Sequence, residues 1–216
     1  MSLSPSQPVA PLDLCIDVSH HNAVVDWTAI AGSGIQVAMI KATEGQGYTD
    51  PKWTAYRDGA LAAGIRVIPY HFTNTDDPDA QAANFVQYCT PGQAYALDWE
   101  GNADNTLSAA DLERLGSALS AQLGRAPLGY WGIPGSTPGQ PTAAMNAWPR
   151  WVPRYRFGAV SAFPAGSSET AGVSCLFWQY TSNGTISGID GPVDRSVAAF
   201  PSADELLAWC DAPPAD

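Results

Sequence analysis

Positive charge is scarce in this chain of 216 residues. It has 10 Lys and Arg against 21 Asp and Glu, so its formal net charge at pH 7 is −11. Proteins that bind nucleic acid or an anionic membrane surface through bulk electrostatics need clustered basic side chains, because these displace counterions. The sequence therefore predicts neither nucleic acid nor a charged membrane surface as a partner.

Long apolar runs are also missing. No window approaches the roughly 20 apolar residues that a membrane-spanning helix needs. The N-terminus reads MSLSPSQPVAPLD, which has neither the positive start nor the apolar run of a signal peptide. We therefore expect no membrane insertion and no export signal in the chain as written.

The cysteines and histidines lack the spacing of a metal site. None of the four cysteines forms a CxxC pair, which disfavours a zinc ribbon, although one or two disulfides remain open: Cys15, Cys89, Cys175 and Cys210. In an extended chain, the adjacent His20 and His21 point in opposite directions, so they do not make an obvious site with Asp17. We expect neither a metal nor a cofactor.

What the chain does contain fits one globular domain that binds neutral polar ligands. Hydrophobic residues make up 45% and charged residues 14%, while Gly (20), Trp (8) and Tyr (8) are plentiful. This length and composition can bury one large core. We expect a tail over residues 1–13, a single barrel domain over 14–211 and a second tail over 212–216. The aromatic content favours carbohydrate as a ligand.

Short apolar runs recur along the whole chain and predict strands. In the first half they alternate with helix-like segments, which is typical of parallel βα units. The runs are DLCIDVS, IQVAMIKA, IRVIPYHF, AYALDWE, APLGYWG, RWVPRY and SCLFWQY. After residue 127 the intervening segments become rich in Gly, Pro and Ser. The sequence therefore predicts a flattened, modified α/β barrel of the TIM type, with about eight strands and fewer outer helices.

Several helix and turn boundaries carry local signals. Asp50-Pro51 predicts a cap and a proline at the first helical position, with Gly64 ending that helix. Ser108 with Asp111, and Ser202 with Glu205, have the spacing of capping boxes. Asn183-Gly184 is typical of a two-residue type I′ hairpin turn.

Two acids end one strand-like run. In ALDWE, Asp98 and Glu100 share one strand face while Trp99 lies on the other, where we expect it to pack. Their Cβ atoms lie about 6.6 Å apart by strand rise, so each charge makes the other carboxyl harder to ionise. One protonated and one ionised carboxyl is the arrangement that glycoside hydrolysis requires. In a βα barrel this site lies at the C-terminal ends of the strands.

Two further acids strengthen that interpretation. Asp17 ends the first strand-like run, and Asp194 lies near the end of the last one. Either alone is more typical of a turn or cap acid. Their recurrence at strand ends in a chain with few charges indicates that they point into the same barrel mouth.

A set of motifs in fixed order resembles glycoside hydrolase family 25, the Chalaropsis-type lysozymes. The motifs span residues 14 to about 196 and read IDVSHHN with DW, IKATEG with YTDP, YHF, QAANF, LDWE, WPRWVPRY and WQYTSNGTISGIDGPVD. The resemblance implies a flattened βα barrel. It also implies cleavage of the β-1,4 bond between N-acetylmuramic acid and N-acetylglucosamine in peptidoglycan.

The same resemblance implies roles for the acids. Glu100 resembles the general acid, and Asp98 resembles the carboxylate that assists the 2-acetamido group of the sugar, the expected nucleophile. Asp17 and Asp194 resemble two further acids of the cleft, which position and tune the central pair. From the residues alone, retention and inversion both stay open, because the carboxyls can converge or splay.

Aromatic and amide side chains beside the strands are candidates for substrate contact. The residues expected to bind the glycan are Tyr70, Tyr130, Trp151, Tyr155, Gln179 and Tyr180. For any one aromatic ring, core packing is an equally good interpretation. Lys41 and Glu44 in IKATEG are expected to support the site, as an ion pair within the barrel.

Two other functions share part of this pattern. A family 18 chitinase also ends a strand in D-x-E, but Gln93 and Ala96 occupy the places of two of its acids. A wall-binding or chitin-binding module without activity would be expected to lack the acids that are present here. The favoured hypothesis is a monomeric muramidase acting on cell-wall peptidoglycan, either a phage endolysin or a secreted lysozyme whose signal has been removed.

Overall fold

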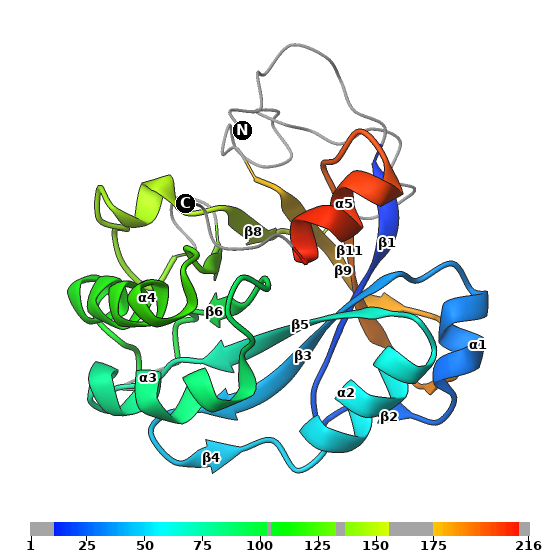
Figure 1. Cartoon of the computed structure of the whole chain (residues 1–216), viewed down its shortest axis with the longest axis horizontal. Helices are drawn as coiled ribbons and strands as arrows, with labels where there is room; N and C mark the ends of the chain where they lie inside the picture. Colours follow the sequence, from blue (N-terminus) through cyan, green and yellow to red (C-terminus); the bar gives the residue numbers. More distant parts are fainter. Residues whose placement is uncertain (1–10, 103–104, 133–136, 156–174, 212–216) are drawn as a thin grey trace.

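Eight strands close into a barrel in the computed structural model, which describes residues 11–102, 105–132, 137–155 and 175–211. Neighbours follow the order β1, β11, β9, β8, β7, β6, β5, β3 and back to β1 (Figure 1). The strands are β1 (Leu12–Val18), β3 (Val37–Glu44), β5 (Arg66–Phe72), β6 (Ala96–Asp98), β7 (Leu128–Tyr130), β8 (Arg150–Pro153), β9 (Phe177–Gly184) and β11 (Val193–Ala198). The predicted modified α/β barrel is confirmed.

Strand direction follows from the length of the connections. From β1 through β3, β5, β6, β7 and β8 to β9, neighbouring strands are parallel. β11 is antiparallel to both β9 and β1. Only residues 185–192 join β9 to β11, and a parallel return needs about a dozen residues or more. The last strand therefore closes the barrel running in the opposite direction.

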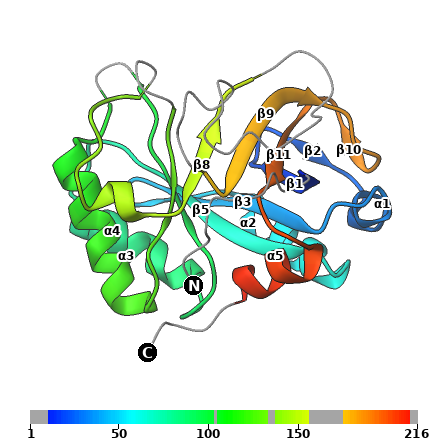
Figure 2. The same ribbon diagram turned by 90° about the horizontal axis from the view of Figure 1, so that it is seen from above.

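Helices cover part of the outside. α1 (Trp27–Gly32), α2 (Trp53–Ala62), α3 (Pro78–Phe85) and α4 (Ala109–Leu123) each lie between successive parallel strands, and α5 (Ala203–Cys210) follows β11. Figure 2 shows α3 and α4 together on one side and α1 on the other. Between β7 and β8 the described residues hold only a 3-10 turn, η2 (Met145–Ala147). No helix of the described chain is long and apolar enough to cross a bilayer.

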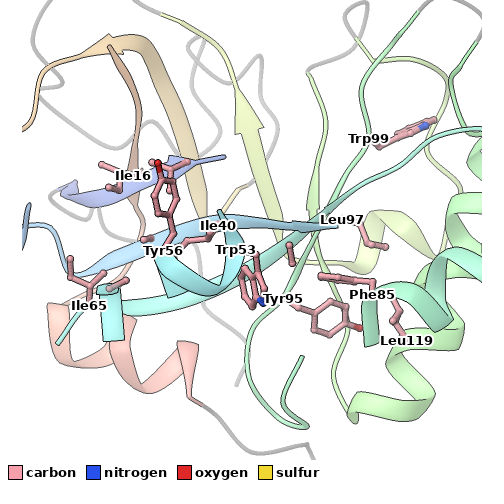
Figure 3. Close-up of a cluster of buried hydrophobic side chains, with 14 of the residues drawn as sticks. Ile16, Ile40, Trp53, Tyr56, Ile65, Phe85, Tyr95, Leu97, Trp99 and Leu119 are labelled. Atoms are coloured by element: carbon pink, nitrogen blue, oxygen red, sulfur yellow. The ribbon is translucent and has the colours of Figure 1, made fainter. Parts of the chain in front are cut away.

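Small elements complete the fold. β2 (Ala23–Val24) pairs with β10 (Ile189–Asp190), β4 (Tyr48–Thr49) pairs with the end of β3, and η1 (Val86–Tyr88) extends α3. Three groups of buried apolar side chains result. The inner core fills the barrel and includes Met39, Trp151 and Phe177, and the outer core lies between the barrel and the helices (Figure 3). A smaller third group includes Val152, Trp178 and Val197. Leu206 and Cys210 of α5 belong to the inner core, so α5 packs against the barrel interior.

The predicted caps are confirmed at two helices, whereas at the third Asp50 caps the turn that precedes the helix. The Ser108 side chain accepts from the Asp111 amide and Ser202 from the Glu205 amide, which confirms both caps. α2, however, begins at Trp53 with no side-chain cap. Asp50 Oδ1 accepts from the Lys52 amide at 2.9 Å, so Asp50 caps the turn that leads into α2. Its other oxygen, Oδ2, accepts from the backbone and ring of His20, at 3.0 and 2.7 Å.

The predicted type I′ hairpin turn at Asn183-Gly184 is wrong. β9 continues through both residues, and Gly184 pairs with Val193 of β11. A Cβ atom on Gly184 would lie 2.6 Å from Cδ of Arg195, so this glycine permits close packing between strands. The reversal comes later, where Gly188 and Gly191 have positive φ angles of 94° and 96°.

All four cysteines are free thiols.

Candidate active site

A pocket of about 360 Å³ opens at the C-terminal ends of the parallel strands. Nine of the ten predicted site residues line it. The lining residues are Asp17, Ser19, His21, Lys41, Glu44, Tyr70, Phe72, Asp98, Glu100, Asn102, Tyr130, Trp151, Tyr155, Gln179 and Asp194. The position agrees with the expectation for a βα barrel, where side chains from several strand ends converge.

β6 presents the central pair of acids. Asp98 is the last residue of the strand and is 9% exposed, whereas Glu100 lies two residues later at the solvent-exposed rim. Trp99 points away from both and is 1% exposed in the outer core, with its indole donating to the Leu107 carbonyl at 2.8 Å. Strand alternation thus continues past the end of β6, as predicted.

Asp17 and Asp194 face the same pocket from β1 and β11. They are Cα partners in the antiparallel ladder between these strands. The sequence placed Asp194 near the end of the last strand, but it is the second residue of β11. It still reaches the mouth, because β11 runs in the opposite direction and its beginning lies level with the end of β1.

Gln179 connects two strands across the pocket floor. Its amide nitrogen donates to Asp17 Oδ2 at 2.9 Å, and its oxygen accepts from the Tyr130 hydroxyl, also at 2.9 Å. The side chain is 2% exposed. Because two of its hydrogen bonds are made within the protein, Gln179 holds Asp17 and Tyr130 in place before any ligand binds.

Tyr180 is the predicted site residue that does not line the pocket. It follows Gln179 in β9, so its side chain lies on the opposite face of the strand. Its hydroxyl donates to the Asp13 carboxylate at 3.0 Å, and its ring lies 6.2 Å from that of Trp178. The prediction of substrate contact for Tyr180 is corrected on this basis, because only alternate residues of β9 face inward.

Aromatic rings form one wall. Tyr130 and Trp151 meet edge to face with centroids 4.5 Å apart, and Tyr70 lies 6.4 Å from Trp151. Trp151 is 2% exposed and donates its indole N–H to the Ser196 hydroxyl at 3.0 Å. Tyr155 differs, because 57% of its surface is exposed at the rim. Trp151 therefore supports the wall, while Tyr155 offers an open face to a ligand.

Burial and mutual repulsion raise the pKa values of the carboxyls. Burial first, and then the charge of Glu100, hold the pKa of Asp98 well above its ordinary value. Burial and the neighbouring Asp194 do the same to the pKa of Asp17. The pKa of Asp194 rises to about 6, mainly by burial, and partial burial also raises the pKa of Glu100. The pocket thus holds protons above the usual carboxyl range.

One atom of the central pair is left without a partner. Asp98 Oδ1 is buried and accepts no hydrogen bond from the described residues. A buried acceptor in that state costs about 1 to 3 kcal/mol, which a donor from a ligand would recover. The pocket therefore offers a preformed acceptor for an N–H or O–H group.

Four lining residues were not predicted as contacts. Ser19 and His21 follow the end of β1, Phe72 ends β5, and Asn102 lies two residues after Glu100. Their positions just at or beyond strand ends were the available signal. The rings of His20 and His21 lie 3.8 Å apart between centroids and do not point in opposite directions, because residues 19–22 form a turn.

The expected Lys41–Glu44 ion pair is confirmed, with 2.7 Å between Nζ and Oε2. Among the described residues, no group of three or more His, Cys, Asp or Glu side chains is arranged to hold a metal ion.

Comparison with known proteins gives consistent results. The family described as "Glycosyl hydrolases family 25" matches residues 16–189. Lysozyme M1 of Streptomyces globisporus is 29% identical over 207 residues, covering 84% of this chain and 66% of that protein. The autolytic lysozyme of Clostridium acetobutylicum is 40% identical over 70 residues, covering 32% of this chain and 22% of that protein. The chain thus spans less than two thirds of each of these relatives.

A solved structure extends the likeness to the whole fold. The bacterial lysozyme from Streptomyces coelicolor superposes with a TM-score of 0.72 at 26% identity, covering 95% of this chain and 99% of that one.

Proposed function

The chain belongs to family 25 of the glycosyl hydrolases, and from this membership and its pocket we propose that it is a muramidase. The substrate is the β-1,4 bond between N-acetylmuramic acid and N-acetylglucosamine in peptidoglycan. The observation that carries the proposal is the pair Asp98 and Glu100, which β6 presents to one pocket at the barrel mouth. It acts on the bacterial cell wall as a monomer, whether released at lysis or secreted.

Glu100 acts as acid and then as base. Its exposed position at the rim allows it to reach the glycosidic oxygen, and its raised pKa favours the protonated form that must donate. In the first step the proton moves to the leaving oxygen as the bond from C1 to that oxygen breaks. In the second step the Glu100 carboxylate takes a proton from water, whose oxygen attacks C1.

Asp98 assists the reacting sugar. The unpartnered Oδ1 suits the N–H of a 2-acetamido group, whose oxygen would then attack C1 and form an oxazolinium ion. Water opens this ion, so the configuration at C1 is retained after two inversions. The acetamido hydrogen bond would also favour the ionised form of Asp98, against the burial that raises its pKa.

The remaining lining residues position the glycan. Asp17 and Asp194 tune the charge of the central pair, and Gln179 fixes Asp17. Tyr155 offers its exposed ring to the apolar face of a sugar, while Tyr70, Tyr130 and Trp151 shape the pocket wall.

Digestion of purified peptidoglycan tests the proposal. Mass spectrometry of the products should find new reducing ends of N-acetylmuramic acid, and Glu100→Gln should reduce their rate of release by about 10²- to 10⁴-fold. Glu205→Gln makes the same chemical change at an exposed residue of α5 and should keep wild-type activity. Absence of release by folded wild-type protein would contradict the proposal. Release from chitin alone would favour a chitinase.

A further inference from the structure

Lys41 is a buried cation in an acidic pocket. The chain has two lysines, and Lys52 is exposed directly before α2, whereas Lys41 is 7% exposed. A lysine is almost never buried without a partner. Among the described residues, the basic side chains that line the pocket are Lys41 and His21, against five carboxyls: Asp17, Glu44, Asp98, Glu100 and Asp194.

A β-bulge in β3 makes the Lys41–Glu44 pair possible. In a regular strand, residues three apart lie on opposite faces. Here the register with β5 shifts between Lys41 and Thr43. Ala42 packs in the outer core, and Thr43 contacts His71 at 2.7 Å, so two successive residues leave the pocket side. Glu44 thereby returns to the face of Lys41, which is a common use of bulges near active sites.

The ammonium reaches toward Asp98. Lys41 is paired with Tyr70 of β5, but its Nζ lies 4.7 Å from the ring centroid of Phe72, two residues further along. Phe72 is in turn the Cα partner of Asp98 in β6. The lysine side chain therefore extends over the intervening strand to the level of Asp98.

We propose that Lys41 is a positioning residue whose ammonium, held by Glu44, favours the ionised form of Asp98 more strongly than that of Glu100. Asp98 is buried and Glu100 is at the solvent-exposed rim, and a charge acts more strongly across a buried path than across a hydrated one. The catalytic consequence rests on the function proposed above: with substrate bound, Lys41 and the acetamido N–H together oppose the burial that raises the pKa of Asp98, so that Asp98 is the ionised helper and Glu100 the proton donor.

The surrounding charges set the size of this effect. Burial, Glu100 and Asp17 raise the pKa of Asp98, whereas Lys41 lowers it. Burial raises the pKa of Glu100. The Tyr130 hydroxyl lowers that pKa, and Lys41 lowers it by a smaller amount. The titratable and charged groups around Lys41 and Asp98 are Asp17 from β1, Glu44 from β3, Tyr48 from β4, Tyr70 and His71 from β5, Glu100 after β6, and Tyr130 from β7. His21 and Asp194 line the same pocket.

A carboxyl titration tests the proposal without requiring activity. Protein labelled with ¹³C at Asp and Glu carboxyls is titrated by NMR, and Asp98→Asn and Glu100→Gln assign the two signals. In Lys41→Met the Asp98 midpoint should rise by about one pH unit or more, with a smaller change at Glu100. Lys41→Arg should keep most of the wild-type midpoint, and Lys52→Met should leave it unchanged. An unmoved Asp98 midpoint, or equal movement of both carboxyls, would overturn the proposal.

Kinetics give a second readout. In Lys41→Met the acid limb of the kcat/KM profile should move to higher pH, because Asp98 must be ionised. A merely structural role would lower the rate equally at all pH values and would count against the proposal. If circular dichroism shows that Lys41→Met does not fold, Lys41→Gln, which keeps a polar head group for Glu44, replaces it. Its Asp98 midpoint should rise in the same way, because the ammonium that lowers that pKa is gone, and an unmoved midpoint would refute the proposal.

The two proposals fail in different ways. If wild-type protein releases no N-acetylmuramic acid ends, the proposed function fails while the titration still decides the role of Lys41. If wild-type protein is active and the Asp98 midpoint does not respond to Lys41→Met, only the role of Lys41 fails.

Discussion

Asp194→Asn should make the protein more stable at neutral pH. The pKa of Asp194 is raised from 3.8 to about 6, first by burial. Between these values the folded protein holds a proton that the unfolded chain has released, so the free energy of unfolding falls as pH rises from about 4 to about 6. Above pH 6 the Asp194 carboxyl is ionised in both the folded and the unfolded state, so the folded state bears the full free-energy cost of the buried charge. Asparagine removes that charge and nearly keeps the shape.

The size of the effect follows from the pKa difference. From 3.8 to about 6, at 1.36 kcal/mol per pH unit, the cost is about 3 kcal/mol. Asp194 is only half-buried and its site is open to water, so we expect a gain of about 1 to 2 kcal/mol at pH 7.5 after screening. For a chain of this length that corresponds to a Tm increase of roughly 2 to 8 °C. Relief of Asp17, whose pKa Asp194 also raises, adds to the gain.

Urea unfolding at pH 3.5 and pH 7.5 measures the effect. The variant should gain stability at pH 7.5 and differ little from wild type at pH 3.5, where the carboxyl is mostly protonated in both the folded and the unfolded state. Asp190→Asn removes an equal charge from an exposed residue of β10 and should show no such pH dependence. If the difference in unfolding free energy between wild type and Asp194→Asn were the same at pH 3.5 and at pH 7.5, the reasoning would be refuted. The kcat of the Asp194→Asn variant should fall, since Asp194 lines the active pocket.

Two further predictions concern β9. Gln179→Leu removes the donor to Asp17 and the acceptor for Tyr130. The value of kcat/KM on peptidoglycan should fall about 10-fold or more, because both side chains lose the hydrogen bond that positions them, and wild-type kinetics would contradict the positioning role. Tyr180→Phe removes only the hydroxyl that donates to Asp13. It should lower the free energy of unfolding by about 1 kcal/mol while kcat/KM stays within twofold, and a large kinetic defect would restore Tyr180 as a substrate contact.

Local signals in the sequence predicted much of the barrel. Period-two alternation placed Trp99 away from Asp98, and that rule needs only neighbouring residues. The caps at Ser108 and Ser202 depend on contacts three residues apart, so they too were visible. Asp50 combines both kinds of contact: its bond to the Lys52 amide is local, but its bond to His20, 30 residues away in the chain, has no signal in the sequence.

Position on a strand face was less predictable where the pairing is irregular. Glu44 reaches the pocket only because of the bulge in β3. Gly184 looked like a turn residue, yet it lies within β9 because Arg195 packs against it. Neither feature can be derived from spacing, since each depends on the register with another strand.

By itself, the sequence determined the alternating strands and helices, the eight-stranded barrel and the acids that follow strand ends, because these depend on short-range periodicity. Only the tertiary structure decided which of these side chains meet. Antiparallel closure by β11 sets Asp194 beside Asp17, and burial leaves Asp98 Oδ1 without a donor. Charge coupling depends on distances between strands that are far apart in the chain, so the electrostatics of the site appear only once the barrel is closed.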